Sequence, residues 1–149
     1  FHQSVDMFVV GGSQIGLSWA QIAEGDIAGG TKQMQETIDQ RSLSGNTEFL
    51  PIWLAFLTEA HLAAGNASAG LRCAERGLEL AARTHQRCWD VELYRLKAEA
   101  MRVRGAPVDE VQAVYRLALE TLEWQGAPGL AARLADSQTG SAAQSALYA

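Results

Sequence analysis

The sequence predicts an all-α protein made of stacked antiparallel helical hairpins. Ala, Leu, Glu, Gln and Arg, which favour helices, dominate the 149 residues, and only three prolines interrupt them. No run of β-branched residues alternates with the period of two that marks a strand. Gly25, Gly65 and Gly105 lie 40 residues apart, which is typical of a repeat protein. Together these observations predict about three hairpin repeats followed by a short terminal helix.

Turn signals set the bounds of the predicted helices, since a glycine that ends one helix is often followed by a residue that begins the next. The helices between these signals are expected near residues 3–24, 28–43, 49–64, 67–84, 89–104, 109–125 and, as a short last element, 128–136. Asn46, Asn66 and Asp109 are the expected N-caps, because a short polar side chain can accept hydrogen bonds from the first amides of a helix.

The last residues differ in composition from the rest. Residues 137–149 are rich in Ser, Ala, Gln and Gly. We therefore expect a repeat domain over residues 1–136 and a flexible tail or linker over residues 137–149. The chain opens on Phe1 rather than on Met, and residues 1–10 already have an amphipathic pattern, so we expect a piece of a longer protein with further domains.

The 40-residue period has a structural reason. In the first two units a second glycine, Gly30 or Gly70, follows five residues after the first one, and it lets two helices approach closely. The second helix of each unit carries one apolar stripe, which a lone hairpin cannot hide from water. Neighbouring hairpins must therefore stack in series, and about three units are the minimum for a stable stack.

Two sequence words carry a resemblance to a known family. The closing glycines and the word YRLAL at residues 115–119 resemble tetratricopeptide (TPR) repeats. The word ELYRL at residues 92–96, together with residues 65–80, is similar to the C-terminal repeat region of large bacterial regulators. In those proteins an adenylate or guanylate cyclase domain, or a transcription-factor domain, and an AAA-type ATPase module precede the repeats. The resemblance covers roughly residues 12–136 and implies a TPR-like right-handed solenoid that acts as an interaction or regulatory module.

The charge and the apolar pattern exclude two classes of partner. The formal net charge is -5, so the chain lacks the excess of Lys and Arg that neutralises a nucleic-acid backbone or an anionic membrane. The longest apolar runs are far shorter than the roughly 20 residues that cross a bilayer. We therefore expect no nucleic acid and no membrane as partner, and a cytoplasmic protein.

No motif for catalysis, for a cofactor or for a metal appears. The three histidines, His2, His61 and His85, are too far apart to place two ligands on one helical face. Cys73 and Cys88 form no CxxC pair, and we expect both to be small buried thiols. Phosphate-binding and nucleophile motifs are absent as well. The sequence thus predicts a non-catalytic chain with no cofactor and no metal.

The best candidate for a binding surface is the concave side that the first helices line in such repeats. On the fifth helix four charged residues follow i, i+3, i+4 spacing and form one ridge. Matching the closing glycines places apolar residues of the earlier units beside this ridge, and such a groove suits an extended peptide or its carboxylate. The alternative is that the ridge pairs only with itself and faces solvent. The predicted surface comprises Trp19, Ile22, Ile52, Ala55, Glu59, Leu62, Glu92, Arg95, Glu99 and Arg102.

Two kinds of function fit this surface. The first is a protein-interaction or regulatory module that binds a protein or peptide, or other domains of the same chain. Exposed apolar surface on an end hairpin also favours a homodimer. The alternative is a small-molecule-sensing domain that controls an attached cyclase, ATPase or DNA-binding domain through a pocket lined by Trp19, Tyr94 and Trp53. Trp89 and Trp124 lie near predicted helix ends, where an exposed ring would indicate an interface.

Overall fold

The structure, a computed structural model, describes the backbone of residues 2–126 and 128–147 and the side chains of residues 11–126 and 131–140. All regular elements in this part of the chain are helices, which confirms the predicted all-α class. The first six predicted helices agree with the observed α-helices to within one residue at each end. The elements are α1 (His2–Ala23), α2 (Ile27–Leu43), α3 (Leu50–Ala63), α4 (Ala67–Thr84), the short 3-10 helix η1 (Arg87–Trp89), α5 (Asp90–Val103), α6 (Val108–Gln125) and α7 (Pro128–Leu147).

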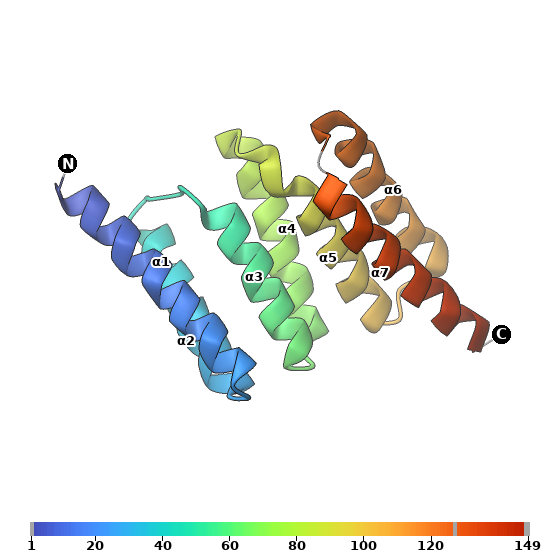
Figure 1. Ribbon diagram of the computed structural model, residues 1–149, viewed down its shortest axis with the longest axis horizontal. Helices are drawn as coiled ribbons and strands as arrows, with labels where there is room; N and C mark the ends of the chain where they lie inside the picture. The colour runs from blue at the N-terminus through green and yellow to red at the C-terminus, as the bar shows by residue number, and fades with distance from the viewer. Residues whose placement is uncertain (1, 127, 148–149) are drawn as a thin grey trace.

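The helices are arranged as consecutive hairpins. α1 packs against α2, α3 against α4 and α5 against α6, and Figure 1 shows these hairpins side by side in chain order. In this view α1, α3, α5 and α7 form one row at the front, with α2, α4 and α6 behind them. α7 contacts both α5 and α6. The front row therefore presents one face that is built from the first helix of each hairpin and from α7.

The same tight turn joins the two helices of each hairpin. Gly25, Gly65 and Gly105 have φ angles of 107°, 75° and 77°, which glycine adopts without steric cost. Each of these amides donates to the carbonyl three residues back at 3.0 Å, and the next amide donates to the carbonyl five residues back at 2.8 to 3.1 Å. This bond pair defines a Schellman ending. The 40-residue period of the sequence is therefore also a period of the backbone.

Side chains cap the start of two second helices. Asp26 before α2 and Asn66 before α4 each accept a hydrogen bond from the amide three residues on, at 3.0 and 3.1 Å. The predicted cap Asn66 is thus confirmed. The other two predicted caps are wrong, because Asn46 lies in the loop before α3 and Asp109 lies inside the first turn of α6, whose N-cap is Pro107.

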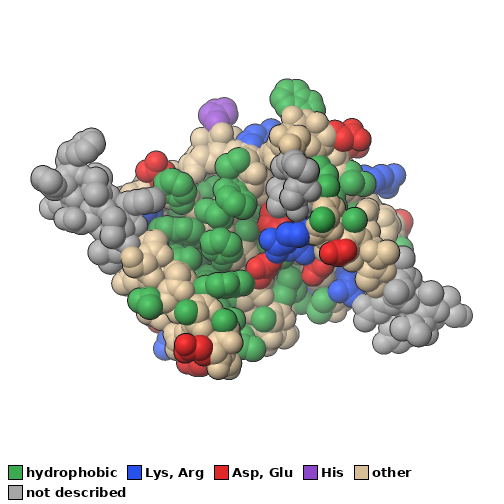
Figure 2. All heavy atoms as spheres, in the orientation of Figure 1, with side chains coloured by type: hydrophobic (Ala, Val, Ile, Leu, Met, Phe, Trp, Pro, Cys, Tyr) green, Lys and Arg blue, Asp and Glu red, His purple; other side chains and the backbone are tan. Residues whose placement is uncertain are grey.

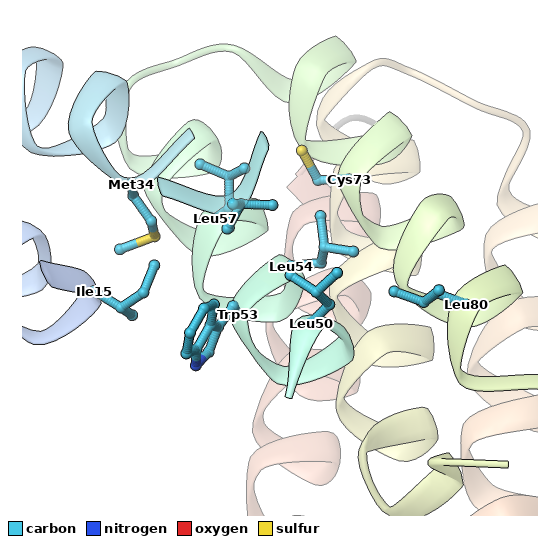
Figure 3. Packing of buried hydrophobic residues seen from close by; sticks show 9 residues of the cluster. Ile15, Met34, Leu50, Trp53, Leu54, Leu57, Cys73 and Leu80 are labelled. Atoms are coloured by element: carbon cyan, nitrogen blue, oxygen red, sulfur yellow. The ribbon is translucent and has the colours of Figure 1, made fainter. Parts of the chain in front are cut away.

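The largest apolar cluster joins the first two hairpins. Ile15 of α1 and Met34 of α2 are 4% and 0% exposed, and Leu54 and Leu57 of α3 are both 0% exposed. In Figure 3, Leu57 points toward Met34, whereas Leu54 lies on the side of Leu80 of α4. Helix α3 thus sends apolar side chains both to the hairpin before it and to its own partner helix.

Apolar packing continues along the stack. Leu93 and Leu96 of α5 form a cluster with Ala55 of α3. Tyr115 of α6 and Leu134 of α7, both 0% exposed, belong to a further cluster around α5. Each hairpin therefore shares buried apolar side chains with the next element, as stacking in series requires.

The loops at the far ends of the hairpins also touch their neighbours. The side-chain oxygen of Gln86 accepts from the amide of Phe49 at 3.1 Å, and its nitrogen donates to the carbonyl of Thr47 at 3.4 Å. One hairpin further on, the side chain of Gln125 donates to the carbonyl of Arg87 at 2.6 Å. Thus Gln86, after α4, binds the loop that precedes α3, and Gln125, at the end of α6, binds η1, which precedes α5.

The last helix is longer than the sequence predicts. A helix is expected over residues 128–136 and a flexible tail over residues 137–149, but α7 continues to Leu147. Within this extension the Ser137 hydroxyl donates to Glu99 of α5 at 2.7 Å. Composition alone indicates a linker here, whereas the hydrogen bond between Ser137 and Glu99 joins the start of this segment to α5. Residues 148–149 lie outside the described residues.

The two glycines predicted to allow close approach differ in how much they are needed. A Cβ on Gly30 would lie 2.6 Å from the carbonyl oxygen of Ser18 in α1, which is shorter than real contacts allow. A Cβ on Gly70 would lie 3.4 Å from the carbonyl oxygen of Thr58, which is ordinary contact. Of these two glycines, only Gly30, at the contact between α1 and α2, is therefore strictly required.

Replacing Gly30 by Ala tests that dependence. Because the new Cβ would press on the backbone of α1, we expect the free energy of unfolding to fall by about 1–3 kcal/mol, although Ala itself favours helices. Urea unfolding at equilibrium measures the change. Gly16→Ala is the matched control, since a Cβ there meets nothing within 4 Å, and it should raise the stability by up to about 1 kcal/mol. Equal effects of the two substitutions would contradict the close packing.

Candidate functional site

Three of the four residues of the predicted ridge, Glu92, Arg95 and Glu99, contact one another, and Arg95 lies at their centre. The Arg95 guanidinium donates to both carboxylate oxygens of Glu92, from Nε at 2.9 Å and from Nη2 at 2.8 Å. Nη1 also donates to Glu99 at 3.3 Å, and Nη2 to Glu59 of α3 at 3.2 Å. Arg95 thus joins three carboxylates from two neighbouring helices of the front row.

Helix α7 adds two polar side chains that the sequence does not single out. Arg133 Nη2 lies 2.6 Å from Oε1 of Glu59 and 2.9 Å from Oε1 of Glu92. The Ser137 hydroxyl donates to Glu99 at 2.7 Å and accepts from Nη1 of Arg95 at 3.0 Å. These contacts bind α7 to α3 and α5. We call the following residues the charged cluster: Glu59, Glu92, Arg95, Glu99, Arg133 and Ser137.

The centre of the charged cluster is withdrawn from solvent. The side chains of Arg95 and Glu92 are 9% and 6% exposed, whereas those of Glu59 and Glu99 are 25% and 27% exposed. Burial lowers the pKa of Arg95, but the hydrogen bond and charge of Glu92 and the charges of Glu99 and Glu59 outweigh burial and raise this pKa overall. Arg95 is therefore a permanent cation held by its neighbours.

Arg95 cannot act as the predicted fork for a peptide carboxylate. A guanidinium has five N–H donors, and Arg95 makes five hydrogen bonds to side chains of α3, α5 and α7. No donor remains for a partner. The alternative that the ridge pairs with itself is therefore closer to the structure, but the ridge is not a solvated face, because α7 contributes to its burial.

Arg102 is the fourth residue of the predicted ridge. It is half-buried and close enough to Tyr115 of α6 for its charge to lower the pKa of that phenol. Burial, followed by the charge of Glu99, nevertheless raises the pKa of Tyr115 overall. Tyr115 is 0% exposed, and its hydroxyl has no hydrogen-bond partner among the described residues. The charges of Arg95 and Glu99 act on Tyr115 as well, so the ridge as a whole lies near α6.

The α1 and α3 part of the front row is apolar. Trp19 is 39% exposed, and its ring centroid lies 5.7 Å from that of Phe56. Ile22, Ile52 and Phe56 are half-buried and pack against the cluster of Figure 3. Figure 2 shows hydrophobic side chains gathered over α1 and α3 and charged ones over α5 and α7. We call Trp19, Ile22, Ile52 and Phe56 the apolar face.

The remaining apolar residues of the predicted surface are more buried than the prediction requires. Ala55 is 3% exposed and belongs to the core with Leu93 and Leu96, so it offers almost no surface. Leu62 is half-buried against the same cluster. Phe56, by contrast, is part of the apolar face although the sequence does not single it out. Its position one helical turn after Ile52 is the signal that could have identified it.

The predicted small-molecule pocket is not formed. Trp53 is 6% exposed in the cluster between the first two hairpins, where the Arg41 guanidinium lies 4.7 Å from its ring centroid. Tyr94 packs instead in the cluster between α5 and α6. Since Trp19 contacts Phe56 on the front face, the three aromatic rings do not line one cavity.

Other reactive side chains are isolated. Within the described residues no group of three His, Cys, Asp or Glu side chains could hold a metal ion. Cys73 is buried, as predicted, and burial raises the pKa of its thiol to about 11, so it is a poor nucleophile. Cys88 is exposed, contrary to the prediction, because it lies in η1 rather than on the apolar stripe of a helix.

The helices also show no membrane-spanning character: in the part of the chain that the structure describes, none is both long and apolar enough to cross a bilayer. No family model, curated protein or solved structure matches the chain. The site must therefore be interpreted from its own geometry.

Replacing Arg95 by Met tests whether the charged cluster is structural. The change leaves Glu92 buried with only Arg133 as counter-ion, so we expect the free energy of unfolding to fall by about 3 kcal/mol. Urea unfolding followed by circular dichroism measures it. Arg76→Met is the matched control, because Arg76 pairs with Asp39 while both side chains stay 42% and 50% exposed, and it should change the stability by less than about 1 kcal/mol. Similar losses in both variants would argue against a special role of Arg95.

Half-buried His61 predicts a pH dependence of stability. Burial, followed by the charge of Arg72, lowers the pKa of His61 below the ordinary histidine value of 6.5. The unfolded chain therefore binds a proton there more readily than the folded chain, so stability falls as the pH drops from neutral through 6.5. We expect His61→Gln to flatten this part of the pH profile in urea unfolding. The matched variant His85→Asn, at an exposed position, should keep the slope of the parent, and an unchanged slope in His61→Gln would disprove the assignment.

Proposed function

We propose that this chain is a non-catalytic TPR-like repeat module that binds a protein partner on the front row of helices. The observation that carries the proposal is the contact between Trp19 and Phe56, which leaves a large aromatic ring 39% exposed beside other apolar side chains. Tryptophan supplies much binding energy when a partner covers it, and it is enriched at the centre of protein interfaces.

The arrangement of hairpins supports a TPR-like right-handed solenoid as the architecture. The glycine turns recur every 40 residues with the same hydrogen bonds, and the first helices of the hairpins share one row (Figure 1). In a solenoid of this kind the first helices line the concave side, where repeat proteins bind their partners. The apolar face and the charged cluster then lie side by side in one groove.

The chemistry of the groove favours an amphipathic helix as the occupant. Apolar side chains at i and i+4 of such a helix cover the apolar face, which is the usual mode of helix-in-groove recognition. The charged cluster holds three carboxylates and two arginines. Glu59 and Glu99 are 25% and 27% exposed, whereas Arg133, which is 52% exposed, is already paired with Glu59 and Glu92. The partner helix therefore carries a basic rather than an acidic flank.

The sequence resemblance adds a context for this module. Residues 65–80 and 92–96 resemble the repeat region of bacterial regulators, so we place the chain in a larger signalling or transcription-regulating protein. In that setting the partner helix belongs to another protein or to another domain of the same chain. The contact between the exposed Trp19 and Phe56 is compatible with regulation through binding.

Selection of helical peptides on the purified chain tests the proposed function. A phage-displayed library of amphipathic helices should yield apolar and basic sequences whose binding shifts the NMR signals of α1 and α3. Trp19→Ser should weaken the selected peptide by about tenfold or more, since it removes a central aromatic contact. Leu43→Ser is the matched control, because Leu43 is 88% exposed on α2 behind the front row.

Two outcomes would contradict binding of a partner helix on the front row. If the selected peptides bind with the same affinity to the Trp19→Ser chain, or shift signals only of α2, α4 and α6, the front row is not the binding surface. If Trp19→Ser instead converts a dimer of the purified chain into a monomer in analytical ultracentrifugation, the apolar face serves self-association and the partner is a second copy.

A further inference from the structure

Glu59 lies where the apolar face meets the charged cluster. Ile52, Phe56 and Glu59 follow i, i+4, i+7 spacing on α3, so their side chains share one side of this helix. Ile52 and Phe56 belong to the apolar face, whereas Glu59 pairs with Arg95 of the charged cluster. Figure 2 shows charged side chains directly beside the hydrophobic ones on the front of the molecule. A helix that covers Phe56 therefore brings its next turn to Glu59.

The carboxylate of Glu59 is fixed in place, yet one of its oxygens remains available. Nη2 of Arg95 and Nη2 of Arg133 both donate to Oε1, at 3.2 and 2.6 Å. Oε2 accepts no hydrogen bond from the described residues, and it keeps contact with solvent. Because two arginines from different helices hold the carboxylate, a partner meets an acceptor that is already oriented, which lowers the entropy cost of binding.

Arg133 shows which kind of group Glu59 binds. It is carried by a helix, α7, and lies 74 residues from Glu59 in the sequence. Its side chain stays 52% exposed while it donates to this carboxylate. Since α7 belongs to the front row (Figure 1), a helix-borne cation can reach Glu59 from the side on which a partner binds. A second cation of this kind finds the remaining oxygen, Oε2.

Glu99, the other partly exposed acid of the charged cluster, is placed differently. It lies on α5, where its Oε1 accepts from Arg95 and from the hydroxyl of Ser137 in α7. The charge of Glu99 also acts on Tyr115 of α6 and raises the pKa of that phenol. Glu99 therefore lies toward α6 and α7, away from the side of α3 that carries the apolar face.

We propose that Glu59 selects the basic side chain of the partner helix. A Lys or Arg three or four residues from the apolar residue that covers Phe56 donates to Oε2, while Oε1 stays bound to Arg95 and Arg133. An acidic residue at that place in the partner is repelled, so the contact gives specificity as well as affinity. This inference rests on the function proposed for the front row and names the contact that determines its partner.

A double-mutant cycle between chain and peptide tests the selection. The probe is the tightest peptide from the library of amphipathic helices, and each of its basic residues is replaced by Gln in turn. One of these replacements should weaken binding to the parent chain by about fivefold or more in isothermal titration calorimetry, since it removes a hydrogen bond between charged groups. The same replacement should have little effect on binding to the Glu59→Gln chain, because the two residues act as a pair.

Two further variants separate selection from a structural role. Glu99→Gln is the matched control, and in this chain the critical basic residue of the peptide should keep its full effect. Glu59→Asp retains the negative charge and should retain the preference for the basic peptide. Loss of the contacts to Arg95 and Arg133 alone would weaken the basic peptide and its Gln version equally, so it would not change the ratio of their affinities.

The outcomes distinguish this inference from the function on which it rests. If the peptides bind the front row in a manner that depends on Trp19, but none of their basic residues is coupled to Glu59, the selection by Glu59 is wrong and the binding surface stands. Coupling to Glu99 in place of Glu59 would also overturn the inference. If no helical peptide binds the front row, the proposed function and the inference fail together.

Discussion

Helix α3 must be covered on two sides, and this requirement organises the rest of the molecule. Leu54 and Leu57 are both 0% exposed, yet they lie toward different neighbours in Figure 3. A helix that is apolar over most of its circumference is stable in water only when other elements flank it. The hairpin before α3 and the helices α4 and α5 after it meet this need. Helix α5 is likewise covered on two sides, because Leu93 and Leu96 pack toward α3 and α4 and Ala98 packs in the cluster with α6 and α7.

The front row changes from apolar to charged along this series. At intervals of 40 residues the sequence places Ile15, Ala55 and Arg95 in corresponding positions of α1, α3 and α5. The first two are buried apolar side chains, whereas Arg95 is a buried cation within the charged cluster. Buried ion pairs contribute little net stability, because desolvation offsets most of their attraction, but removing one partner is costly. The charged cluster therefore fixes where α7 lies on α3 and α5 more than it strengthens that contact.

The parts of the fold that depend on local chemistry could be predicted from the sequence. A Schellman turn needs little more than a glycine at the right position, so Gly25, Gly65 and Gly105 marked the hairpins and the helix bounds correctly. The extent of α7 could not be predicted, since its second half has a linker-like composition and yet the helix continues to Leu147. Arg133 lies within the predicted helix, but its partners Glu59 and Glu92 lie on other helices, so local spacing could not identify its role.

The candidate site was predicted only in part, and the reason is again physical. Spacing on a helix identified Glu92, Arg95 and Glu99 as neighbours on one ridge, because i, i+3, i+4 relations are local. Spacing could not show that Glu59 and the residues of α7 satisfy every donor of Arg95, since those contacts come from other helices. A charged side chain that looks available in the sequence was thus already bound within the fold.

Positions that stacking requires keep their apolar character from one unit to the next, whereas positions on the front row do not. Ile38 of α2, Leu78 of α4 and Ala118 of α6 stand 40 residues apart, and each packs in an apolar cluster. Trp19 and Glu59 are separated by the same interval on the front row but share no chemistry. In these two series the position on the second helices keeps its apolar character, whereas the position on the front row does not. Glu59 is held by Arg95 and Arg133 within the charged cluster, whereas Trp19 remains 39% exposed, so packing accounts for the first of these two residues but not for the second.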